Sequence, residues 1–398
     1  METAPNEVII QPISSGELER RWTAVRKAMA EQGIDCLVMQ NSNQFLGGYV
    51  RWFTDVPTWH GYPVTVLFPV DDGMTYIMSG GTPPPPKPHP GVYRGVKQRI
   101  ARPYFRTMHY TDAMDAGAAA DALDARNSRV VGIVSKGSMS AAFYEYLRTK
   151  FPRVEFVDAT DLVDEIKAVK SPEELELTRK AIAIQDAVWG AVPAFVRPGR
   201  REYEVRIDIQ HLLLELGSEE EQLINLGSAP AGAPARQRAS FFQNRILRPG
   251  DQFCIMIEIN GPGGFYGELG RTICLGEPPA ELLKVWEVAK EAQRHAAALL
   301  KPGARPADVF KAHNDFLTSL GYPPEGRIFA HGQGYDLVER PAIRDDETMV
   351  LKANMNIAIH PVVQTETAYA FCCDNYLVGE NGTERLHKTP LEVFVACC

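Results

Sequence analysis

The sequence predicts an α/β protein of two domains: a three-layer domain over residues 1–164 and an internally duplicated α/β domain over residues 165–398. Three observations lead to this prediction. The chain has 398 residues, whereas one hydrophobic core rarely grows beyond about 250–300. In the first part, helical and strand-like apolar patterns alternate. In the second part, one long pattern occurs twice.

The first domain opens with an amphipathic helix at residues 16–32, where apolar side chains recur at helical spacing. Short apolar strands are expected at 36–39, 64–68, 75–78 and 130–134, and another helix at 141–150. Alternation of this kind is typical of a sheet covered by helices on both faces. The proline-rich run at 83–90 predicts an extended surface loop.

A strong helix start marks the junction between the domains, which we place near residues 161–168. Ser171 is followed by Pro172 in the first turn and by Glu174 three residues on, which is the pattern of a capping box. The helix that begins here should continue to about Ala194.

The second domain contains an internal repeat. The run VRPGRREYEV (196–205) and the run LKPGARPADV (300–309) each follow a long helical pattern. Each leads into a helix that closes at a glycine, Gly217 or Gly321, at the same spacing from its Pro-Gly pair. Apolar strands follow in both copies. The repeat predicts two similar halves with a pocket between them.

Polar residues stand within the apolar strands of this domain. Glu258 lies between Ile257 and Ile259, and His360 directly follows an apolar run. Burying a carboxylate is unfavourable unless another group pairs with it. One such residue alone is more often a structural polar group, but several in one domain indicate a shared pocket.

These segments resemble the five metal-ligand motifs of the superfamily of aminopeptidase P, prolidase, methionine aminopeptidase and creatinase. The most specific matches are Gly250-Asp251, Arg271-Thr272, His331-Gly-Gln-Gly334, and Leu377-Val378 with Glu380-Asn-Gly382. The run Asn244–Leu247 is similar to creatinase in particular. The resemblance implies a creatinase-type N-terminal domain followed by the pita-bread fold, in which two Asp, one His and two Glu residues face one pocket.

In this chain, the five ligand positions are changed. In order, they hold Met256 or Glu258, then Glu268, His331, His360 and Cys373. The first is ambiguous because counting from Gly250-Asp251 and counting back from Arg271-Thr272 give different residues on the same strand face. Two divalent ions need bridging carboxylates, and both family glutamates are replaced. We therefore predict no metal and no cofactor, with a single zinc or iron as the alternative.

The resemblance implies a metal-independent, creatinase-like hydrolase of a C–N or amide bond in a small zwitterionic or cyclic molecule. The predicted catalytic residues are Glu258, Glu268, His331 and Glu339. The predicted substrate-binding residues are His360, Tyr266, Tyr335, Trp59 and His60. An ion pair with Arg340 or Arg344 is the structural alternative for Glu339. Simple packing is the alternative for the tyrosines and for the 59–60 pair.

Three other functions stay open: a lyase like the dimethylsulfoniopropionate lyases on this fold, a single-metal hydrolase like the Xaa-Pro aminopeptidases, and a non-catalytic binding protein. The net charge of −8 argues against a nucleic-acid groove, and no apolar stretch is long enough for a membrane span. Seven cysteines without C-x-x-C spacing predict no disulfide framework and favour a cytoplasmic location. The resemblance implies a homodimer in which the N-terminal domain of one chain lies near the site of the other.

Overall fold

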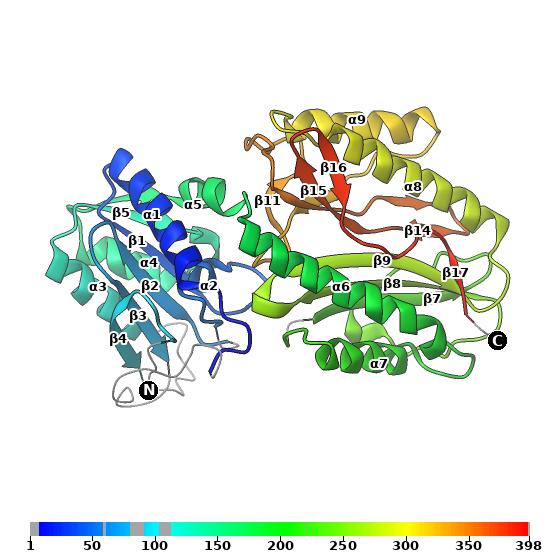
Figure 1. Cartoon of the computed structure of the whole chain (residues 1–398), viewed down its shortest axis with the longest axis horizontal. Coiled ribbons are helices and arrows are strands. Elements are labelled where there is room, and N and C mark those ends of the chain that lie inside the picture. Colours follow the sequence, from blue (N-terminus) through cyan, green and yellow to red (C-terminus); the bar gives the residue numbers. More distant parts are fainter. Residues whose placement is uncertain (1–7, 59–60, 80–90, 103–112, 221, 397–398) are drawn as a thin grey trace. The chain divides into compact units, whose positions relative to one another are not determined.

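The computed structural model describes residues 8–58, 61–79, 91–102, 113–220 and 222–396 (Figure 1). The chain divides into two compact units, Met1–Lys167 and Ala168–Cys398. The expected boundary lay between residues 164 and 165. The predicted loop at 83–90 and the candidate residues Trp59 and His60 lie outside the described residues.

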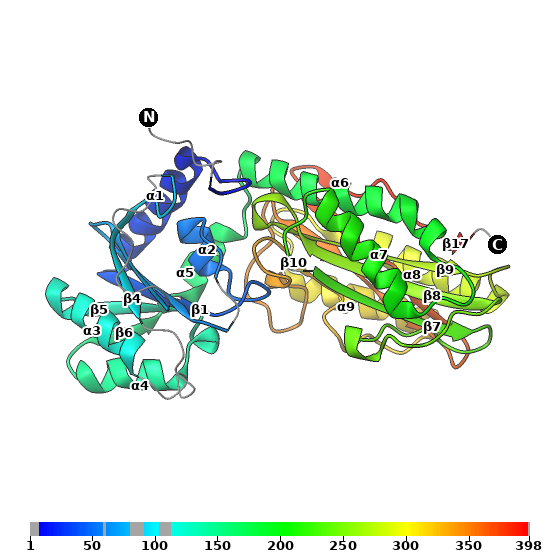
Figure 2. The same cartoon turned by 90° about the horizontal axis from the view of Figure 1, so that it is seen from below.

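The first unit has the predicted three layers. Its six-stranded sheet has the order β4-β3-β2-β1-β5-β6. The strands are β1 (Cys36–Asn41), β2 (Val64–Pro69), β3 (Met74–Ser79), β4 (Val96–Arg102), β5 (Val130–Val134) and β6 (Glu155–Asp158). The helices are α1 (Ser15–Glu31), α2 (Tyr49–Thr54), α3 (Met114–Arg126), α4 (Ala141–Lys150) and α5 (Thr160–Lys167). Helices α1, α2 and α5 cover one face of the sheet, and α3 and α4 cover the other (Figure 2).

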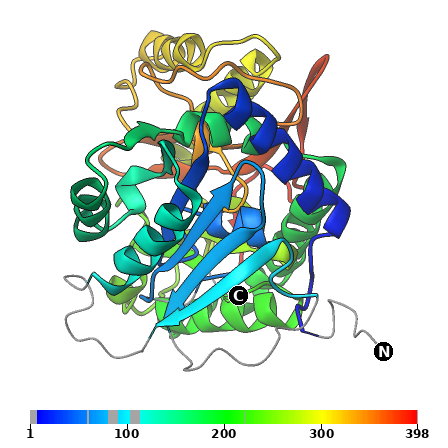
Figure 3. The same ribbon diagram turned by 90° about the vertical axis from the view of Figure 1, so that its left-hand side faces the viewer.

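The core of this unit combines small side chains on α3 with larger apolar side chains on α4. Ala116, Ala119 and Ala120 let α3 lie close to the sheet, while Phe143 and Leu147 of α4 fill the space beside it. The strands twist relative to one another in the way that β-sheets usually do (Figure 3).

Among its described residues, the second unit contains two sheets, which are antiparallel except for one parallel strand pair at an edge, and four long helices: α6 (Pro172–Phe195), α7 (Glu202–Glu215), α8 (Ala280–Leu299) and α9 (Pro306–Ser319). The first sheet, β17-β9-β8-β7, is built from β7 (Gln222–Pro230), β8 (Asp251–Asn260), β9 (Tyr266–Cys274) and β17 (Phe394–Val395). The second, β11-β10-β12-β15-β16, is built from β10 (Ala330–Gly332), β11 (Glu339–Ala342), β12 (Asn356–Ile359), β15 (Asp374–Gly379) and β16 (Gly382–Arg385). Strands β13 (Val362–Gln364) and β14 (Tyr369–Phe371) form a hairpin.

The predicted duplication is confirmed in detail. Each half contains a long helix, a Pro-Gly turn, a second helix and antiparallel strands. Gly199 and Gly303 have φ angles of 89° and 85°, in the region that favours glycine. The Gly199 N–H donates to Leu247 O at 2.8 Å, and the Gly303 N–H donates to Leu351 O at 2.9 Å. The two halves thus repeat the same turn and the same hydrogen bond.

The two halves meet in an antiparallel bridge between Gly270 of β9 and Cys373. The N–H of each residue donates to the carbonyl of the other at 3.1 Å. A Cβ atom on Gly270 would overlap the Phe371 ring and would lie 3.0 Å from Cys373 Cβ. Only glycine therefore permits this close approach of the strands.

The predicted capping box begins α6. Ser171 Oγ accepts from the Glu174 N–H at 3.2 Å, and the Ser171 N–H donates to Glu174 Oε2 at 2.8 Å. No helix among the described residues has the length and the apolar character that crossing a membrane requires.

Candidate active site

Two glutamates face each other across the β8–β9 hairpin. Glu258 and Glu268 are direct partners in this antiparallel pair, so their side chains share one face of the sheet. Met256 is paired with Gly270 and packs in an apolar cluster with Tyr369 and Phe371. The structure therefore places Glu258, and not Met256, opposite Glu268.

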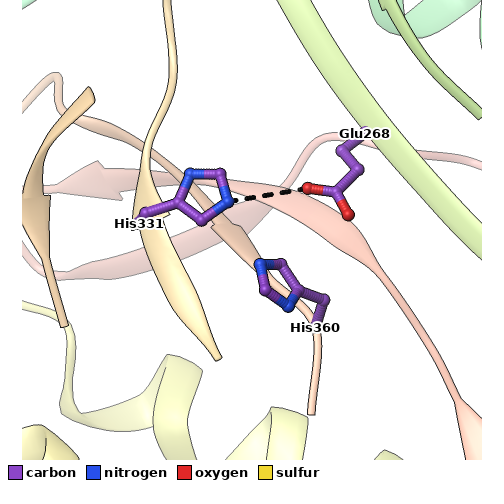
Figure 4. A group of neighbouring side chains, drawn as sticks. All are labelled: Glu268, His331 and His360. Atoms are coloured by element: carbon purple, nitrogen blue, oxygen red, sulfur yellow. Dashed lines mark ion pairs between the residues drawn. The ribbon is translucent and has the colours of Figure 1, made fainter. Parts of the chain in front are cut away.

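Two histidines approach the glutamates from the other half. His331 lies on β10, and His360 follows β12, the strand paired with β10. Their ring centroids are 5.0 Å apart. His331 Nε2 lies 3.7 Å from Glu268 Oε2. One donor atom from each of Glu268, His331 and His360 lies within 4.8 Å of the others, and the three side chains converge (Figure 4).

Hydrogen bonding fixes the tautomer of His331. Its Nδ1–H donates to Gly332 O at 2.9 Å, because a carbonyl oxygen can only accept. In the neutral ring, Nε2 then carries a lone pair, and this atom faces Glu268. Burial lowers the pKa of His331 to about 4, so the ring is neutral at pH 7.

Burial acts on the carboxyl groups in the opposite direction. It raises the pKa of Glu268 to about 7. It also raises the pKa of Glu258 well above its usual value, and the neighbouring Glu268 adds to this increase. The two carboxyl groups therefore share at least one proton near neutral pH, and Glu268 is the group whose pKa suits proton exchange there.

A fixed positive charge lies beside His360. Arg327 Nη2 is 3.2 Å from His360 Nδ1 and donates to His360 O at 3.3 Å. Arg327 Nε also donates to Glu325 at 2.9 Å, and the Arg327 side chain is 48% exposed. Burial, His331 and Arg327 together lower the pKa of His360 well below its usual value.

Glu339 is held in a buried ion pair. Lys170 Nζ donates to its Oε2 at 2.7 Å, and the Tyr335 N–H donates to its Oε1 at 2.7 Å. The partner suggested by the sequence was wrong, since Arg340 pairs with Glu347 and Arg344 pairs with Asp346. Both oxygens of Glu339 are thus engaged in fixing the loop that follows His331.

The two candidate tyrosines lie in the same region of the second unit. Tyr266 is fully buried, and its N–H donates to Gly334 O at 2.7 Å. The Tyr335 ring packs against Phe265 with centroids 4.4 Å apart. Both residues border the His-Gly-x-Gly segment.

The site does not fit a pair of metal ions. The Cys373 thiol donates to the Glu268 carbonyl oxygen at 3.4 Å, and burial raises its pKa well above the usual value. Cys373 is not among the described residues whose donor atoms converge in the site, which are Glu268, His331 and His360. Arg327 adds a positive charge where a second ion would need negative ligands. Within the described part of the chain, the convergent donors suit one ion.

Four residues that shape this site were not predicted from the sequence: Lys170, Arg327, Gln333 and Asn375. Gln333 Nε2 donates to Glu258 Oε1 at 2.7 Å, and Asn375 Nδ2 donates to Gln333 Oε1 at 2.8 Å. The position of Gln333 inside the His-Gly-x-Gly motif was an available signal, since that segment had to border the pocket. The others depend on contacts between distant elements.

Comparisons with known proteins agree with the resemblance. The sequence model of metallopeptidase family M24 matches residues 176–380, and that of the creatinase/prolidase N-terminal domain matches residues 21–169. A probable dipeptidase PepE of Mycobacterium bovis is 30% identical over 244 residues, which are 60% of this chain and 63% of that protein. The alignment thus spans less than two thirds of that relative.

Two further proteins match over nearly the whole chain. Ectoine hydrolase of Halomonas elongata is 24% identical over 420 aligned positions, covering 96% of this chain and 98% of that protein. The crystal structure of dipeptidase PepE from Mycobacterium ulcerans has a TM-score of 0.78 at 23% identity, and the match covers 97% of this chain and 99% of that one.

Proposed function

Because this chain belongs to metallopeptidase family M24, we propose that it is a hydrolase of a C–N or amide bond in a small molecule, and that it works without a pair of metal ions. The observation that carries the proposal is the pairing of Glu268 with His331, whose Nε2 lone pair faces the carboxyl group at 3.7 Å. A buried carboxyl group and a neutral imidazole in this arrangement form an acid–base pair.

In the proposed mechanism, Glu268 takes a proton from water as the water oxygen attacks the carbonyl or amidine carbon. His331 Nε2 relays that proton to the nitrogen that leaves when the C–N bond breaks. Water is thus divided between the two products, an acid or its equivalent and an amine. The pKa of Glu268, about 7, suits a base that works near neutral pH.

Arg327 supports a substrate that carries a negative group. Its guanidinium is partly exposed and lies beside His360, where it can meet a carboxylate in a charge-assisted hydrogen bond. Dipeptides and ectoine, which the relatives named above hydrolyse by their names, both carry such a group. A zwitterionic amide or cyclic amidine is therefore the substrate class that we propose.

The experiment is a hydrolysis screen of the protein after metal ions have been removed with a chelator. The test compounds are dipeptides, Xaa-Pro dipeptides, ectoine and creatine. We expect His331→Ala to lower turnover by about 10²–10⁴-fold while the circular dichroism spectrum is unchanged. His211→Ala is the matched control, because His211 is exposed on α7 and pairs with Glu215. Full activity in His331→Ala, or two metal ions per chain by elemental analysis of protein that was not treated with chelator, would contradict the proposal.

A hydrolase with a single metal ion is the second candidate, favoured by the convergence of donor atoms from Glu268, His331 and His360. These three residues would hold the ion, which would supply a Lewis acid and an activated water. One bound ion per chain, lost together with activity in His360→Ala, would favour this candidate over the metal-independent one.

A further inference from the structure

Buried side-chain amides next to the active site form a chain of hydrogen bonds in which the donor and acceptor role of each amide is fixed. It starts at the backbone of Glu268, whose N–H donates to Asn375 Oδ1 at 2.8 Å. This contact fixes the orientation of the Asn375 amide, because a backbone N–H can only donate. Asn375 Nδ2 must then be a donor, and it contacts Gln333 Oε1 at 2.8 Å and Asn356 Oδ1 at 3.1 Å.

The orientation of Gln333 follows from that of Asn375. Since Gln333 Oε1 accepts from Asn375, its Nε2 faces the other way. There it donates to Glu258 Oε1 at 2.7 Å and to Leu337 O at 3.3 Å. Turning the amide over would place oxygen against the Leu337 carbonyl and nitrogen against Asn375 Nδ2. Asn356 Nδ2 also donates to Gln333 O at 3.2 Å, which holds the Gln333 backbone in place.

Full burial makes this arrangement costly to break. Gln333 and Asn375 expose none of their surface, and Asn356 exposes 1%. A buried amide group that loses its partner cannot turn to water, so the amide chain has one low-energy arrangement. Glu258 is therefore held at Oε1, while Glu268 directs Oε2 towards His331.

We infer that Gln333 is a positioning residue that fixes Glu258 through the amide chain from Asn375, so that the two facing glutamates take different roles. Glu258 is the stationary hydrogen-bonding group that orients the substrate, and Glu268 is the group that exchanges a proton with His331. This assignment rests on the proposed hydrolase function, and it gives separate roles to two glutamates that the sequence analysis placed together among the catalytic residues.

The test combines crystal structures with kinetics of Gln333→Met, which keeps the side-chain length and removes the hydrogen bond. We expect the Glu258 side chain to leave its present rotamer and kcat to fall by about 10²-fold, as for a misplacement of roughly 1 Å at a reacting group. KM should change much less. Gln243→Met is the matched control, because Gln243 is also a buried amide that donates to backbone carbonyls, those of Ile224 and Arg238; it should lose stability without losing kcat.

Asn375→Asp provides a second variant if Gln333→Met does not fold. It keeps an acceptor for the Glu268 N–H and replaces the donor that faces Gln333, so the Gln333 amide should turn over and Glu258 should move. An unmoved Glu258 in the folded variants, or a wild-type kcat in them, overturns the inference. If the wild-type chain cleaves none of the screened compounds, the proposed function fails, and the position of Glu258 in the crystal structures alone decides the role of Gln333.

Discussion

A buried histidine outside the catalytic pair shows how single residues are kept in one protonation state. His387 Nδ1 accepts from the Asn375 N–H at 3.1 Å, and its Nε2–H donates to Gln185 Oε1 at 3.0 Å. Gln185 cannot turn over, because its Nε2 donates to the carbonyls of Ile257 and Gly267. Only the neutral ring satisfies these contacts, and burial lowers the pKa of His387 to about 4.

Acidification should therefore destabilise the second unit through His387. The unfolded histidine binds its proton near pH 6.5, whereas the folded one does so near pH 4. The stability is fully present above pH 6.5 and is lost as the pH falls towards 4, by on the order of 3 kcal/mol for this one group. Glu268 acts in the opposite direction. Its raised pKa contributes stability that is fully present below pH 4.5 and is lost as the pH rises through about 7, so only a difference between variants isolates His387.

Urea unfolding at pH 7, 6 and 5 measures that difference. Relative to wild type, His387→Gln should lose stability at pH 7 and show a flatter decline on acidification. His211→Gln, at an exposed position, should follow the wild-type curve. Parallel curves for wild type and His387→Gln would show that His387 does not contribute to the pH dependence.

At the scale of the elements, the bridge between Gly270 and Cys373 joins the two halves of the second unit. A residue larger than glycine at position 270 would not fit there. Gly270→Ala should lower the free energy of unfolding by about 1–3 kcal/mol, because the new methyl group overlaps the buried Phe371 ring and lies 3.0 Å from Cys373 Cβ. Gly190→Ala is the control. Gly190 lies in α6 with open space around its Cβ position, so alanine there should stabilise the helix by about 0.5–1 kcal/mol.

Thermal and urea unfolding of both variants provide the measurement. A Gly270→Ala protein as stable as wild type would mean that the strands can separate at this point without loss, and the bridge would then not be a structural requirement.

Elements were predictable from the sequence where their signals are local. The start of α6 is predicted by Ser171, Pro172 and Glu174, and the repeat is predicted by the glycines of the two Pro-Gly turns. The catalytic candidates were visible as polar residues in apolar strands. The register of β8 was not, because the turn at 262–264 decides which residue stands opposite Glu268. Partners such as Lys170 for Glu339 were equally hidden, since 169 positions separate them.

At the scale of the whole molecule, the resemblance to creatinase still predicts a homodimer. Size-exclusion chromatography with light scattering should give a mass near twice 44.2 kDa. The predicted contact of Trp59 and His60 with the partner's site would then be checked by Trp59→Ala, which should raise KM and leave the mass unchanged. A monomer that is fully active in the hydrolysis screen would show that this site is complete within one chain.

The two halves of the second unit share the geometry of their Pro-Gly turns but differ in the chemical groups that they bring to the site. Both halves keep the same hydrogen bond at Gly199 and Gly303, yet one half supplies carboxyl groups and the other supplies imidazoles. Substitutions on the strands can thus replace one site side chain with another while the turns keep the backbone structure unchanged. The double variant His360→Glu with Cys373→Glu would place glutamates at the two positions where the resembling family carries them, and would test whether the scaffold then binds a pair of metal ions.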